Sequence, residues 1–572
     1  MRCVSDTARR PPPAPPRAQS LLRKLHCDKY DVTLISPKNY FLFTPLLAST
    51  TTGRTSKSSI IEPIRGFCER ADASDVRFVE SDAVAVDIES NTVTCRDSSE
   101  IVGKRDEFEV EYDYLVVAVG AESATFNTPG VREHAVFMKQ VGHSRIIRSR
   151  VLDALETACI PGQSEQEIER LLSFCVVGGG PAGVEYAGEL QDFLSNDAKQ
   201  AYPEVADKCS VKIIEGLPHI LGRFTKDSIE FAEEQMRSSG VELMTDHFVR
   251  KVEPGAITLS HRMTKAVSTV PYGVLVWVTG IAPRPLVQAL IASIGADKGQ
   301  TNRRALIVRL ACARAACVAA HSTARSPRCP SFIYRYILRE SCSHFDSLPL
   351  TYLTMRAQLQ RARPQVDDKL RVAGTDNVFA MGDCASLRRL PQTAQVASQE
   401  GKFLGRAFNE VAERLHTKHR ARRASSAAGA TAAAIAAEGA SERERERESA
   451  AGAFESIAPF QYAHRGAMAY VGGAKVSFSF IYRYILRESC SQFDSLPLTS
   501  LTILGAKAVA DFPALNQEKN DASAHHSAAG FMTYWVWRSV YLSKLLSFRN
   551  RISVGMDWTK AYVFGRDTSR HE

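Results

Sequence analysis

Three glycines spaced as G-x-G-x-x-G are the strongest chemical signal in the chain. Gly178, Gly180 and Gly183 occupy these positions. They follow the apolar run Ser173–Val177 and open a helical pattern. In that context the first glycine permits a tight turn, the second lets a pyrophosphate approach the backbone, and the third lets helix and strand pack closely. Because the helix N-terminus then presents its amides to the diphosphate, the segment predicts a dinucleotide site.

An acid ends the next apolar run. Val211–Glu215 reads as a strand, and a carboxylate at its end accepts hydrogen bonds from an adenosine 2′-hydroxyl and repels a 2′-phosphate. Glu215 therefore favours NADH over NADPH; the alternative is a solvated acid at the end of a strand. Its separation from the glycines exceeds the usual ~20 residues, which indicates a long intervening helix through Tyr202–Pro203.

Three more apolar runs end in small residues, a pattern typical of parallel strands that open onto a cofactor. They are Tyr114–Ala121, Val274–Gly280 and Asn377–Cys384. The third ends in Gly-Asp, which can place a carboxylate and a backbone amide against a ribityl–diphosphate chain. With the glycine motif, these strands describe two dinucleotide domains in one chain. The candidate NADH ligands at the second strand end are Thr279 and Gly280. We interpret Cys384 as a buried packing thiol rather than a redox thiol, because no partner cysteine is near it in sequence.

Composition and charge limit the classes of protein. The chain has 572 residues and a net charge of +9, with 44% hydrophobic and 24% charged residues. This balance fits a globular protein of two or three domains. Residues 1–24 carry a net charge of +5 and residues 309–366 carry +7, so the remainder carries −3 and no nucleic-acid partner is indicated. No apolar stretch reaches the ~18 residues of a spanning helix. Thirteen cysteines without a C-x-x-C pair argue against a zinc ribbon, and we expect no metal site.

Two segments are nearly identical copies of each other. Ser331–Thr354 and Ser479–Thr502 match at 22 of 24 positions. Structural repeats come in threes or more and tolerate drift, so two such copies indicate duplicated nucleic acid. We interpret 309–366 and 476–505 as insertions; a duplicated docking helix is the alternative. Residues 420–453 are rich in alanine and then alternate Glu and Arg, which favours a solvated linker over an exposed helix.

The C-terminal part combines aromatic, apolar and basic residues at helical spacing. Three of the four tryptophans, Trp535, Trp537 and Trp558, lie in the last forty residues. The apolar set is Trp537, Val540, Tyr541, Leu545 and Phe548, and the cations are Arg538, Lys544, Arg549 and Arg551. An aromatic, basic, amphipathic helix suits a bilayer interface. The alternative is a helix that packs on the back of a domain.

From about Leu25 to Arg570, outside the insertions and linker, the chain resembles the type II (alternative, rotenone-insensitive) NADH:quinone oxidoreductases. The motifs that carry the resemblance are Tyr40–Leu47, Gly178–Glu185, Pro271–Gly273, Ala282–Pro285, Gly382–Asp383 and Pro391–Gly401. The resemblance implies an α/β protein with two Rossmann-like dinucleotide-binding domains, the NADH domain being nested in the FAD domain. It also implies non-covalent FAD and a C-terminal membrane-binding region.

The resemblance also implies roles for single residues. Glu185 corresponds to the family acid near the nicotinamide. Ala394–Gly401 corresponds to the quinone-side A-Q-x-x-x-Q stretch, in which Gln395 and Gln399 share one helix face and can hydrogen-bond quinone carbonyls without adding a charge. Without the resemblance these two glutamines read as ordinary polar helix residues. The candidate FAD ligands are Ser36, Lys38, Thr44, Pro45, Ala118, Gly120, Gly382, Asp383 and Ala394.

The chain departs from the family pattern at its front. Members begin with a further G-x-G-x-x-G turn for the FAD diphosphate, whereas the first glycine here is Gly53. Leu21–Lys24 reads as the end of the first helix and Tyr30–Ser36 as the second strand. We therefore expect the FAD domain to lack its first strand and glycine loop, and we expect FAD to bind poorly or not at all.

These observations define a segmentation and a function. The expected segments are a Pro/Arg-rich N-terminus (1–24), the N-terminal half of the FAD domain (25–170), the NADH domain (171–308), an insertion (309–366), the C-terminal half of the FAD domain with the quinone-side helix (367–419), a linker (420–453), the C-terminal membrane-binding region (454–475 and 506–572) and a second insertion (476–505). The expected function is non-electrogenic transfer of hydride from NADH to FAD and of electrons to ubiquinone.

The sequence leaves other functions open. They are a defective or non-catalytic isoform that binds NADH without FAD, and another NAD(P)H or sulfide:quinone reductase of the superfamily. The resemblance places the protein peripherally on the mitochondrial inner membrane. The Arg-rich, acid-poor start resembles a transit peptide, although its five prolines make a poor amphipathic helix. The oligomeric state, for which a homodimer is one candidate, is left open.

Overall fold

The computed structural model describes residues 2–4, 16–70, 76–99, 101, 105–295, 363–387, 390–426, 452–464, 466–474, 506–513, 525–545 and 547–569. They fall into two compact units. Unit 1 combines Met1–Lys38, Cys68–Glu122 and Ile281–Gln461, and unit 2 combines Asn39–Phe67, Ser123–Gly280 and Tyr462–Glu572. The segment 25–170, predicted as the N-terminal half of the FAD domain, is therefore distributed over both units. The predicted insertions lie outside the described residues, apart from 363–366 at the end of the first.

Unit 1 is built on a five-stranded parallel sheet. Its order is β20 (Val378–Ala380), β9 (Leu115–Val117), β1 (Arg2–Val4), β2 (Val32–Ser36) and β5 (Val76–Glu80). Strands β2, β9 and β20 bury every residue, as expected for strands of a parallel sheet that is covered on both faces. The strands predicted within Tyr30–Ser36, Tyr114–Ala121 and Asn377–Cys384 are confirmed with shorter bounds.

Strand β1 corrects one sequence-based expectation. We expected the first strand of the FAD domain to be absent, but Arg2–Val4 pairs in parallel with β2 on one side and with β9 on the other. These residues therefore occupy the central place in the sheet. The sequence did not indicate this strand, because a run of three residues that starts with Arg2 is too short to show the alternation of a strand. The connection from β1 to the next helix still contains no glycine, since the first glycine of the chain is Gly53.

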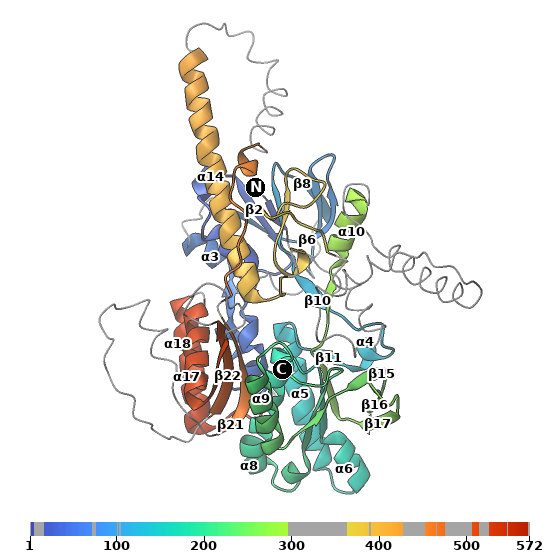
Figure 1. Cartoon of the computed structure of the whole chain (residues 1–572). Coiled ribbons are helices and arrows are strands. Elements are labelled where there is room, and N and C mark those ends of the chain that lie inside the picture. The colour runs from blue at the N-terminus through green and yellow to red at the C-terminus, as the bar shows by residue number, and fades with distance from the viewer. Residues whose placement is uncertain are drawn as a thin grey trace, which may run out of the picture. The chain divides into compact units, whose positions relative to one another are not determined.

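A long helix packs beside the first helix of unit 1. Helix α14 (Ala394–Ser426) contacts α1 (Pro16–Leu22) closely, since a Cβ on Gly405 would lie 2.8 Å from the carbonyl oxygen of Leu21. Helix α14 has 33 residues and is the longest helix among the described residues (Figure 1). The predicted linker 420–453 is thus helical as far as Ser426, and 427–451 lies outside the described residues.

Unit 1 also contains an antiparallel sheet and several short elements. An antiparallel sheet contains β6 (Asp82–Asp87), β7 (Thr92–Arg96) and β8 (Glu107–Glu111), and α10 (Pro285–Ile294) packs on β6. Short helices are η1 (Cys27–Lys29) and η6 (Gly382–Cys384). Where the chain changes units lie α3 (Ile64–Arg70) and the paired strands β10 (Ala121–Ser123) and β19 (Ile281–Pro283).

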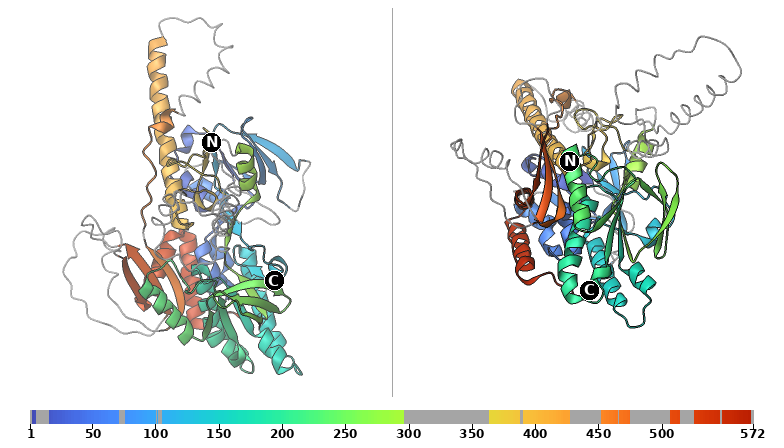
Figure 2. Two further views of the ribbon diagram at one scale, coloured as in Figure 1. Left: turned by 45° about the vertical axis from the view of Figure 1, so that its right-hand side comes forward. Right: turned by 60° about the horizontal axis from the view of Figure 1, so that its bottom comes forward.

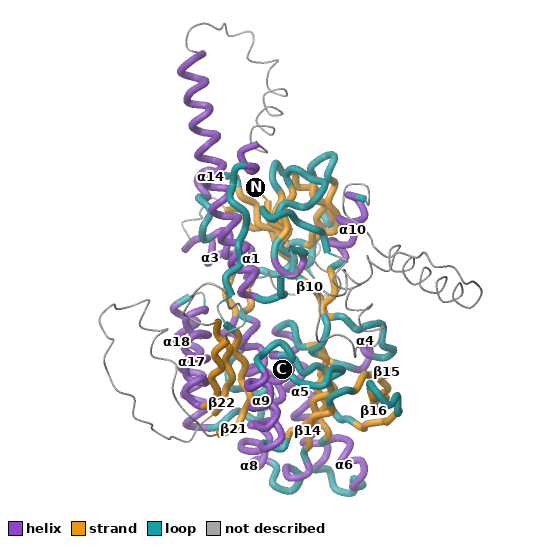
Figure 3. The backbone as a smooth tube through the Cα atoms, viewed as in Figure 1, coloured by secondary structure: helices purple, strands orange, loops and turns teal. Residues whose placement is uncertain are grey.

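Unit 2 contains the second parallel sheet. Its order is β11 (Val136–Phe137), β18 (Val274–Trp277), β12 (Ser173–Val177), β13 (Ser210–Ile214) and β14 (Val241–Met244). Alternate residues face opposite ways. Phe174 and Val176 pack with α5 (Val141–Ala158), α7 (Pro181–Phe193) and α9 (Lys226–Ser238), whereas Cys175 and Val177 pack with the antiparallel sheet of β15 (His247–Glu253), β16 (Ala256–His261) and β17 (Val267–Pro271). Figure 3 shows helices on one side of the parallel strands and the β15–β16 strands on the other.

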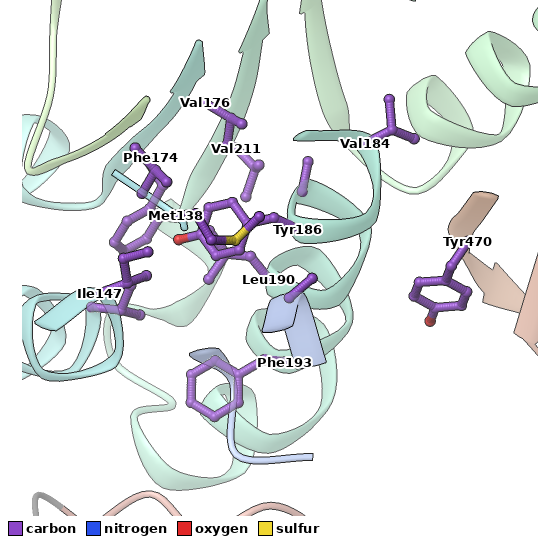
Figure 4. Close-up of a cluster of buried hydrophobic side chains, with 14 of the residues drawn as sticks. Met138, Ile147, Phe174, Val176, Val184, Tyr186, Leu190, Phe193, Val211 and Tyr470 are labelled. Carbon is purple, nitrogen blue, oxygen red and sulfur yellow. The ribbon is translucent and has the colours of Figure 1, made fainter. Parts of the chain in front are cut away.

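A C-terminal module covers the outer side of α7. It consists of the antiparallel sheet β21 (Ala467–Ala474), β22 (Ala506–Pro513) and β23 (His525–Gly530) with α17 (Phe531–Lys544) and α18 (Phe548–Phe564). Helix α17 lies beside β22 in the views of Figures 1 and 2, in agreement with the contacts between them. In Figure 4 the Tyr186 ring and the Leu190 side chain point from α7 toward Phe174, while Tyr470 of β21 lies on the other side of the helix. Helix α7 is therefore buried between two layers.

The remaining elements of unit 2 connect these layers. They are β3 (Tyr40–Leu42), η2 (Thr44–Leu46), α2 (Leu47–Thr51), η3 (Lys57–Ile60), β4 (Ile61–Pro63), α4 (Val131–His134), α6 (Glu165–Leu171), the π-helix η4 (Leu194–Ala198), α8 (Lys199–Ala201) and η5 (Ala206–Lys208). The strand predicted at Val211–Glu215 is confirmed as β13. The predicted long helix ends at Ala201, just before Tyr202–Pro203.

The predicted bilayer-facing residues of the C-terminal helix differ in exposure: Trp537 and Leu545 are buried, Val540 and Tyr541 are half-buried, and Phe548, which begins α18, is 75% exposed. Trp537 and Leu545 of this region and Trp558 of α18 belong to the main core of unit 2. Arg538 stacks on the rings of Tyr534 and Trp558, with its Cζ atom 4.5 and 4.4 Å from the two ring centroids. The alternative of a packing helix is therefore correct for α17. No helix in the described residues is long and apolar enough to cross a bilayer.

Candidate functional site

The glycine turn lies between β12 and α7, where the sequence predicts it. A Cβ on Gly178 would lie 2.9 Å from the Cβ of Thr279, and one on Gly183 would lie 1.9 Å from the carbonyl oxygen of Gly178. The folded protein itself therefore requires these two glycines, and the turn packs against the end of β18. Gly180 differs, because no atom would lie within 4 Å of its Cβ. Its missing side chain leaves open space over the N-terminus of α7, where a pyrophosphate is expected.

Glu215 is hydrogen-bonded beside this turn. Its Oε2 accepts the N–H of Gly179 at 2.7 Å and its Oε1 accepts the N–H of Leu217 at 2.9 Å. The carboxylate is thus held at the turn rather than free in solvent. Its predicted contact with an adenosine ribose stays a prediction, and this position is compatible with it. Gly280, the last of the predicted NADH residues near the turn, has a φ of +77°, and a Cβ at this position would lie 2.5 Å from Cζ of Phe126.

Three pairs of predicted FAD residues lie at the ends of three parallel strands of the unit 1 sheet. Ser36 ends β2 and precedes Lys38, Ala118 and Gly120 follow β9, and Gly382 and Asp383 follow β20. Ligands of open α/β sheets bind outside the carboxyl ends of the strands, so the structure brings these candidates to the expected edge. Gly120 and Gly382 have φ values of +74° and +77°, a conformation that favours glycine.

The quinone-side residues lie on the first turns of α14, also in unit 1. Ala394 begins the helix, so Gln395 and Gln399 share one side of it, as their spacing predicts. The next residue, Glu400, was not predicted: it is only 2% exposed, and its Oε2 accepts the N–H of Gly382 at 2.5 Å. The Gly382 amide is therefore engaged within the protein, and the predicted contact of the Gly-Asp turn with a ribityl–diphosphate chain stays a prediction. Cys384 is a buried packing thiol, as expected.

Thr44 and Pro45 lie in unit 2, within η2. The short helix α2 follows η2 directly and is buried against the core of unit 2.

Glu185 lies on α7 on the side that the C-terminal module covers. It is 7% exposed, and its nearest backbone donor is the N–H of Tyr470, 3.5 Å from Oε1. Burial raises the pKa of this carboxyl to about 8, although the side chains of Trp537 and Tyr541 and the Tyr470 amide each lower it. Removal of the negative charge from water accounts for the direction. At neutral pH Glu185 therefore holds a proton.

The chain matches two family models and several known proteins. The model of the pyridine nucleotide-disulphide oxidoreductases matches residues 17–304, and that of the NDH2 C-terminal domain matches residues 499–567. The chain is 33% identical, over 96% of its length and 78% of the relative's, to an external alternative NADH-ubiquinone oxidoreductase of mitochondria from Yarrowia lipolytica. It is 31% identical, over 96% and 80%, to the mitochondrial external NADH-ubiquinone oxidoreductase 2 of Saccharomyces cerevisiae.

The chain belongs to the type II NADH:quinone oxidoreductases. The crystallised NDH2 of Plasmodium falciparum in complex with NADH shares its fold, with a TM-score of 0.68 at 22% identity over 99% of both chains. The predicted fold class of two Rossmann-like domains with a C-terminal region is confirmed. In the present chain the match to the NDH2 C-terminal domain covers β22, β23, α17 and α18 of the C-terminal module.

Sequence reasoning missed a buried charged cluster on the covered side of α7. Glu189, one helical turn after Glu185, is 4% exposed in its side chain and lies between two guanidinium groups. Arg54 approaches its Oε2 with Nε at 3.0 Å, and Arg566 approaches the same oxygen with Nη2 at 3.3 Å. Asp192 accepts from Arg54 at 3.2 Å. The spacing of the three acids at 185, 189 and 192 was the available signal, since it places them on one side of a helix.

The residues present fit FAD only incompletely. The strand ends of unit 1 provide the expected positive-φ glycines and the Asp383 carboxylate beside them. The glycine turn for the diphosphate is missing, because residues 5–15 include no glycine. Among the described residues no three His, Cys, Asp or Glu side chains gather so as to hold a metal ion.

Proposed function

We propose that this chain transfers a hydride from NADH to FAD and two electrons onward to ubiquinone, without pumping protons. The observation that carries the proposal is the turn of unit 2, in which open space above Gly180 meets the N-terminus of α7 and the Glu215 carboxylate. This combination suits NADH, since the acid accepts from a ribose 2′-hydroxyl and repels a 2′-phosphate. The names of the relatives, as NADH-ubiquinone oxidoreductases, support the same reaction.

Each group of residues has one task in this reaction. The turn residues bind the NADH pyrophosphate through backbone amides, and Glu215 orients the adenosine end. The residues that we assign to FAD are Ser36, Lys38, Thr44, Pro45, Ala118, Gly120, Gly382, Asp383 and Ala394. When bound, FAD supplies the two-electron chemistry, and the protein contributes alignment and exclusion of water. Gln395 and Gln399 hold quinone carbonyls by neutral hydrogen bonds.

Glu185 holds a proton in the layer between α7 and the C-terminal module. Quinone reduction to quinol consumes one proton more than NADH supplies as hydride, so a neutral carboxyl near neutral pH is a suitable proton-holding group. The raised pKa, about 8, keeps the proton in place in the resting protein. The covering rings of Tyr470, Trp537 and Tyr541 exclude water from it.

A bilayer surface is the proposed partner of α18. Its inward side carries Asn550, Val554 and Trp558, whereas its outward side carries exposed apolar residues. These are Phe548, Ile552, Met556, Tyr562, Val563 and Phe564. Arg549 and Lys560 lie on the same exposed surface and suit anionic head groups. Because the relatives are named as mitochondrial, we infer peripheral binding to the mitochondrial inner membrane. A homodimer is a further proposal.

The first experiment is a visible spectrum of the purified full chain in detergent, before and after addition of NADH. Flavin bands that bleach with NADH and return with ubiquinone support the proposal. A colourless protein that still binds NADH supports the alternative of a non-flavin isoform, for which the missing glycines before Gly53 are the specific observation. Bleaching that persists after ubiquinone contradicts the quinone as acceptor.

A further inference from the structure

The Arg54 side chain has four partners in unit 2. Its guanidinium donates Nη1–H to the Tyr534 hydroxyl at 3.4 Å and Nη2–H to Oδ2 of Asp192 at 3.2 Å, and Nε lies 3.0 Å from Glu189. Its Cζ atom also lies 5.7 Å from the centroid of the Tyr470 ring. These four partners come from α7, β21 and α17, so one planar fork joins the NADH-binding helix to the C-terminal module.

Arg54 lies ten residues or fewer after Thr44 and Pro45, two of the candidate FAD ligands. Thr44 and Pro45 form η2, which continues directly into α2. The helix ends at a left-handed turn, in which Gly53 has a φ of +76° and donates its N–H to the Thr50 carbonyl at 3.4 Å. Thr55 then returns to α2 through its N–H, 3.2 Å from the carbonyl oxygen of Ser49.

Packing and hydrogen bonds hold the segment from Phe43 to Arg54 in place. Leu46 and Leu47 are buried in the core that also contains α7 residues, and Phe43 donates its N–H to Ile60 at 2.8 Å. Core packing and backbone hydrogen bonds thus hold the chain between Pro45 and Arg54, so the position of Arg54 is coupled to that of Thr44 and Pro45.

We propose that Arg54 is a positioning residue for hydride transfer, which fixes the Thr44–Pro45 segment against the NADH-binding helix α7. The proposal rests on the proposed function, since it needs NADH at the glycine turn and flavin at Thr44 and Pro45. Hydride transfer requires the nicotinamide carbon that gives the hydride and the flavin nitrogen that takes it to lie in near-contact, and a displacement of 1 Å costs up to ~100-fold in rate. Burial between two acids also explains why a guanidinium is used, because an ammonium cannot serve two carboxylates and a hydroxyl in one plane.

Arg566 supplies the matched control. It donates Nη1–H to the Glu189 carbonyl at 2.8 Å, and its Nη2 lies 3.3 Å from the same Oε2 that Arg54 approaches. Its backbone N–H donates to Asp197 at 2.6 Å. Arg54→Lys and Arg566→Lys each replace a guanidinium beside Glu189 by an ammonium and so keep the positive charge. Only Arg54 belongs to the segment that also carries Thr44 and Pro45. Tyr534→Phe removes a single Arg54 contact and serves as a milder second variant.

The test compares these variants in the full chain reconstituted with FAD. Stopped-flow absorbance gives the rate of flavin reduction at saturating NADH, equilibrium titrations give the dissociation constants of NADH and of FAD, and thermal unfolding matches the variants for stability. We expect Arg54→Lys to slow flavin reduction by ~10–100-fold and to weaken FAD binding while NADH affinity is retained. Tyr534→Phe shifts both in the same direction by less, and Arg566→Lys leaves both near wild type.

Equal slowing by Arg54→Lys and Arg566→Lys overturns the proposal, because the effect then belongs to the buried acid and not to the flavin-side segment. Unchanged rates in Arg54→Lys overturn it as well. Absence of any NADH-dependent bleaching in the wild-type protein overturns the proposed function, and this proposal with it. Bleaching in the wild type together with either of the first two results overturns the positioning role alone.

Discussion

Gly188 of α7 and Gly472 of β21 meet backbone to backbone. A Cβ on Gly188 would lie 3.0 Å from the amide nitrogen of Gly472, and a Cβ on Gly472 would lie 3.2 Å from the Cα of Gly188. This close approach brings β21 onto α7 between Glu185 and Glu189, so that the sheet of the C-terminal module closes over both acids. The burial of Glu185, and hence its raised pKa, depends on two missing side chains.

We predict that Gly188→Ala loosens this contact. The added methyl group must push β21 away from α7, which costs about 1–3 kcal/mol in the free energy of unfolding. Urea unfolding measures the loss. Gly142→Ala is the control, because no atom lies within 4 Å of a Cβ at that position in α5 and alanine there stabilises a helix by about 0.5–1 kcal/mol. Equal stability of Gly188→Ala and wild type would show that the close approach is not maintained in solution.

The protonated state of Glu185 predicts a pH dependence of stability. Burial raises its pKa from 4.5 to about 8, so between these pH values the folded protein keeps a proton that the unfolded chain releases. The free energy of unfolding should therefore fall as pH rises through this window, by up to about 1.4 kcal/mol per pH unit, and level off above it. Glu185→Gln removes this slope. Unfolding curves at several pH values test it, with the exposed Glu204→Gln as the control that keeps the wild-type slope. An unchanged slope in Glu185→Gln contradicts the buried neutral acid.

The two glycines Gly180 and Gly183 should fail in different ways. A methyl group on Gly183 would overlap the carbonyl oxygen of Gly178 at 1.9 Å, so Gly183→Ala should lose at least ~1–3 kcal/mol of stability. Gly180→Ala meets open space, and its cost as a helix cap is below ~1 kcal/mol. Its loss should appear as NADH affinity reduced by ~10-fold or more, because the pyrophosphate needs that space. Calorimetric titration with NADH measures the affinity, and urea unfolding measures the stability. If Gly180→Ala binds NADH as tightly as wild type, the pyrophosphate does not bind at this turn.

Local patterns in the sequence predict the parallel strands and the glycine turn because each depends on neighbouring residues. The run before Gly178, the acid at Glu215 and the helical spacing of Gln395 and Gln399 are all local signals. Residues from distant segments gave no such signal. The hydrogen bond from Gly382 to Glu400 joins residues whose pairing depends on the packing of α14 against the sheet.

The C-terminal region shows the limit of amphipathic patterns. The spacing that includes Trp537 and Leu545 is correct for a helix with one apolar side, but it does not say whether that side meets lipid or protein. Only the fold shows that α7 lies there to be covered. In the same way, Arg54 follows a Thr-Thr-Gly stretch without any pattern, and its acids are contributed by a helix far along the chain.

The missing FAD glycine turn leads to a gain-of-function prediction. Strand β1 ends at Val4 and α1 begins at Pro16, and the eleven residues between them contain no glycine. Replacement of this connection by a G-x-G-x-x-G turn restores backbone amides for the diphosphate, each worth about 1.5–3 kcal/mol as a hydrogen bond to a charged group. We expect the FAD dissociation constant to fall by at least ~10-fold per recovered amide. Titration of apo-protein with FAD measures this. The control carries a loop of equal length with serines for glycines; an equal gain there would assign the effect to loop length.

The exposed side of α18 predicts how the protein holds a membrane. Ile552 and Met556, the latter 67% exposed, are one turn apart on the outward side. A fully buried apolar side chain contributes about 1.5–3 kcal/mol, so Ile552→Glu with Met556→Glu should lower partition into phosphatidylcholine vesicles that contain anionic phosphatidylserine by ~10-fold or more. Vesicle sedimentation measures the partition, and circular dichroism checks that the helix persists. Met263→Glu replaces a residue that is 62% exposed between β16 and β17, and it should bind as wild type does. If Met263→Glu loses as much binding as the α18 variant, general charge repulsion explains the effect; a larger loss in α18 assigns the bilayer contact to this helix.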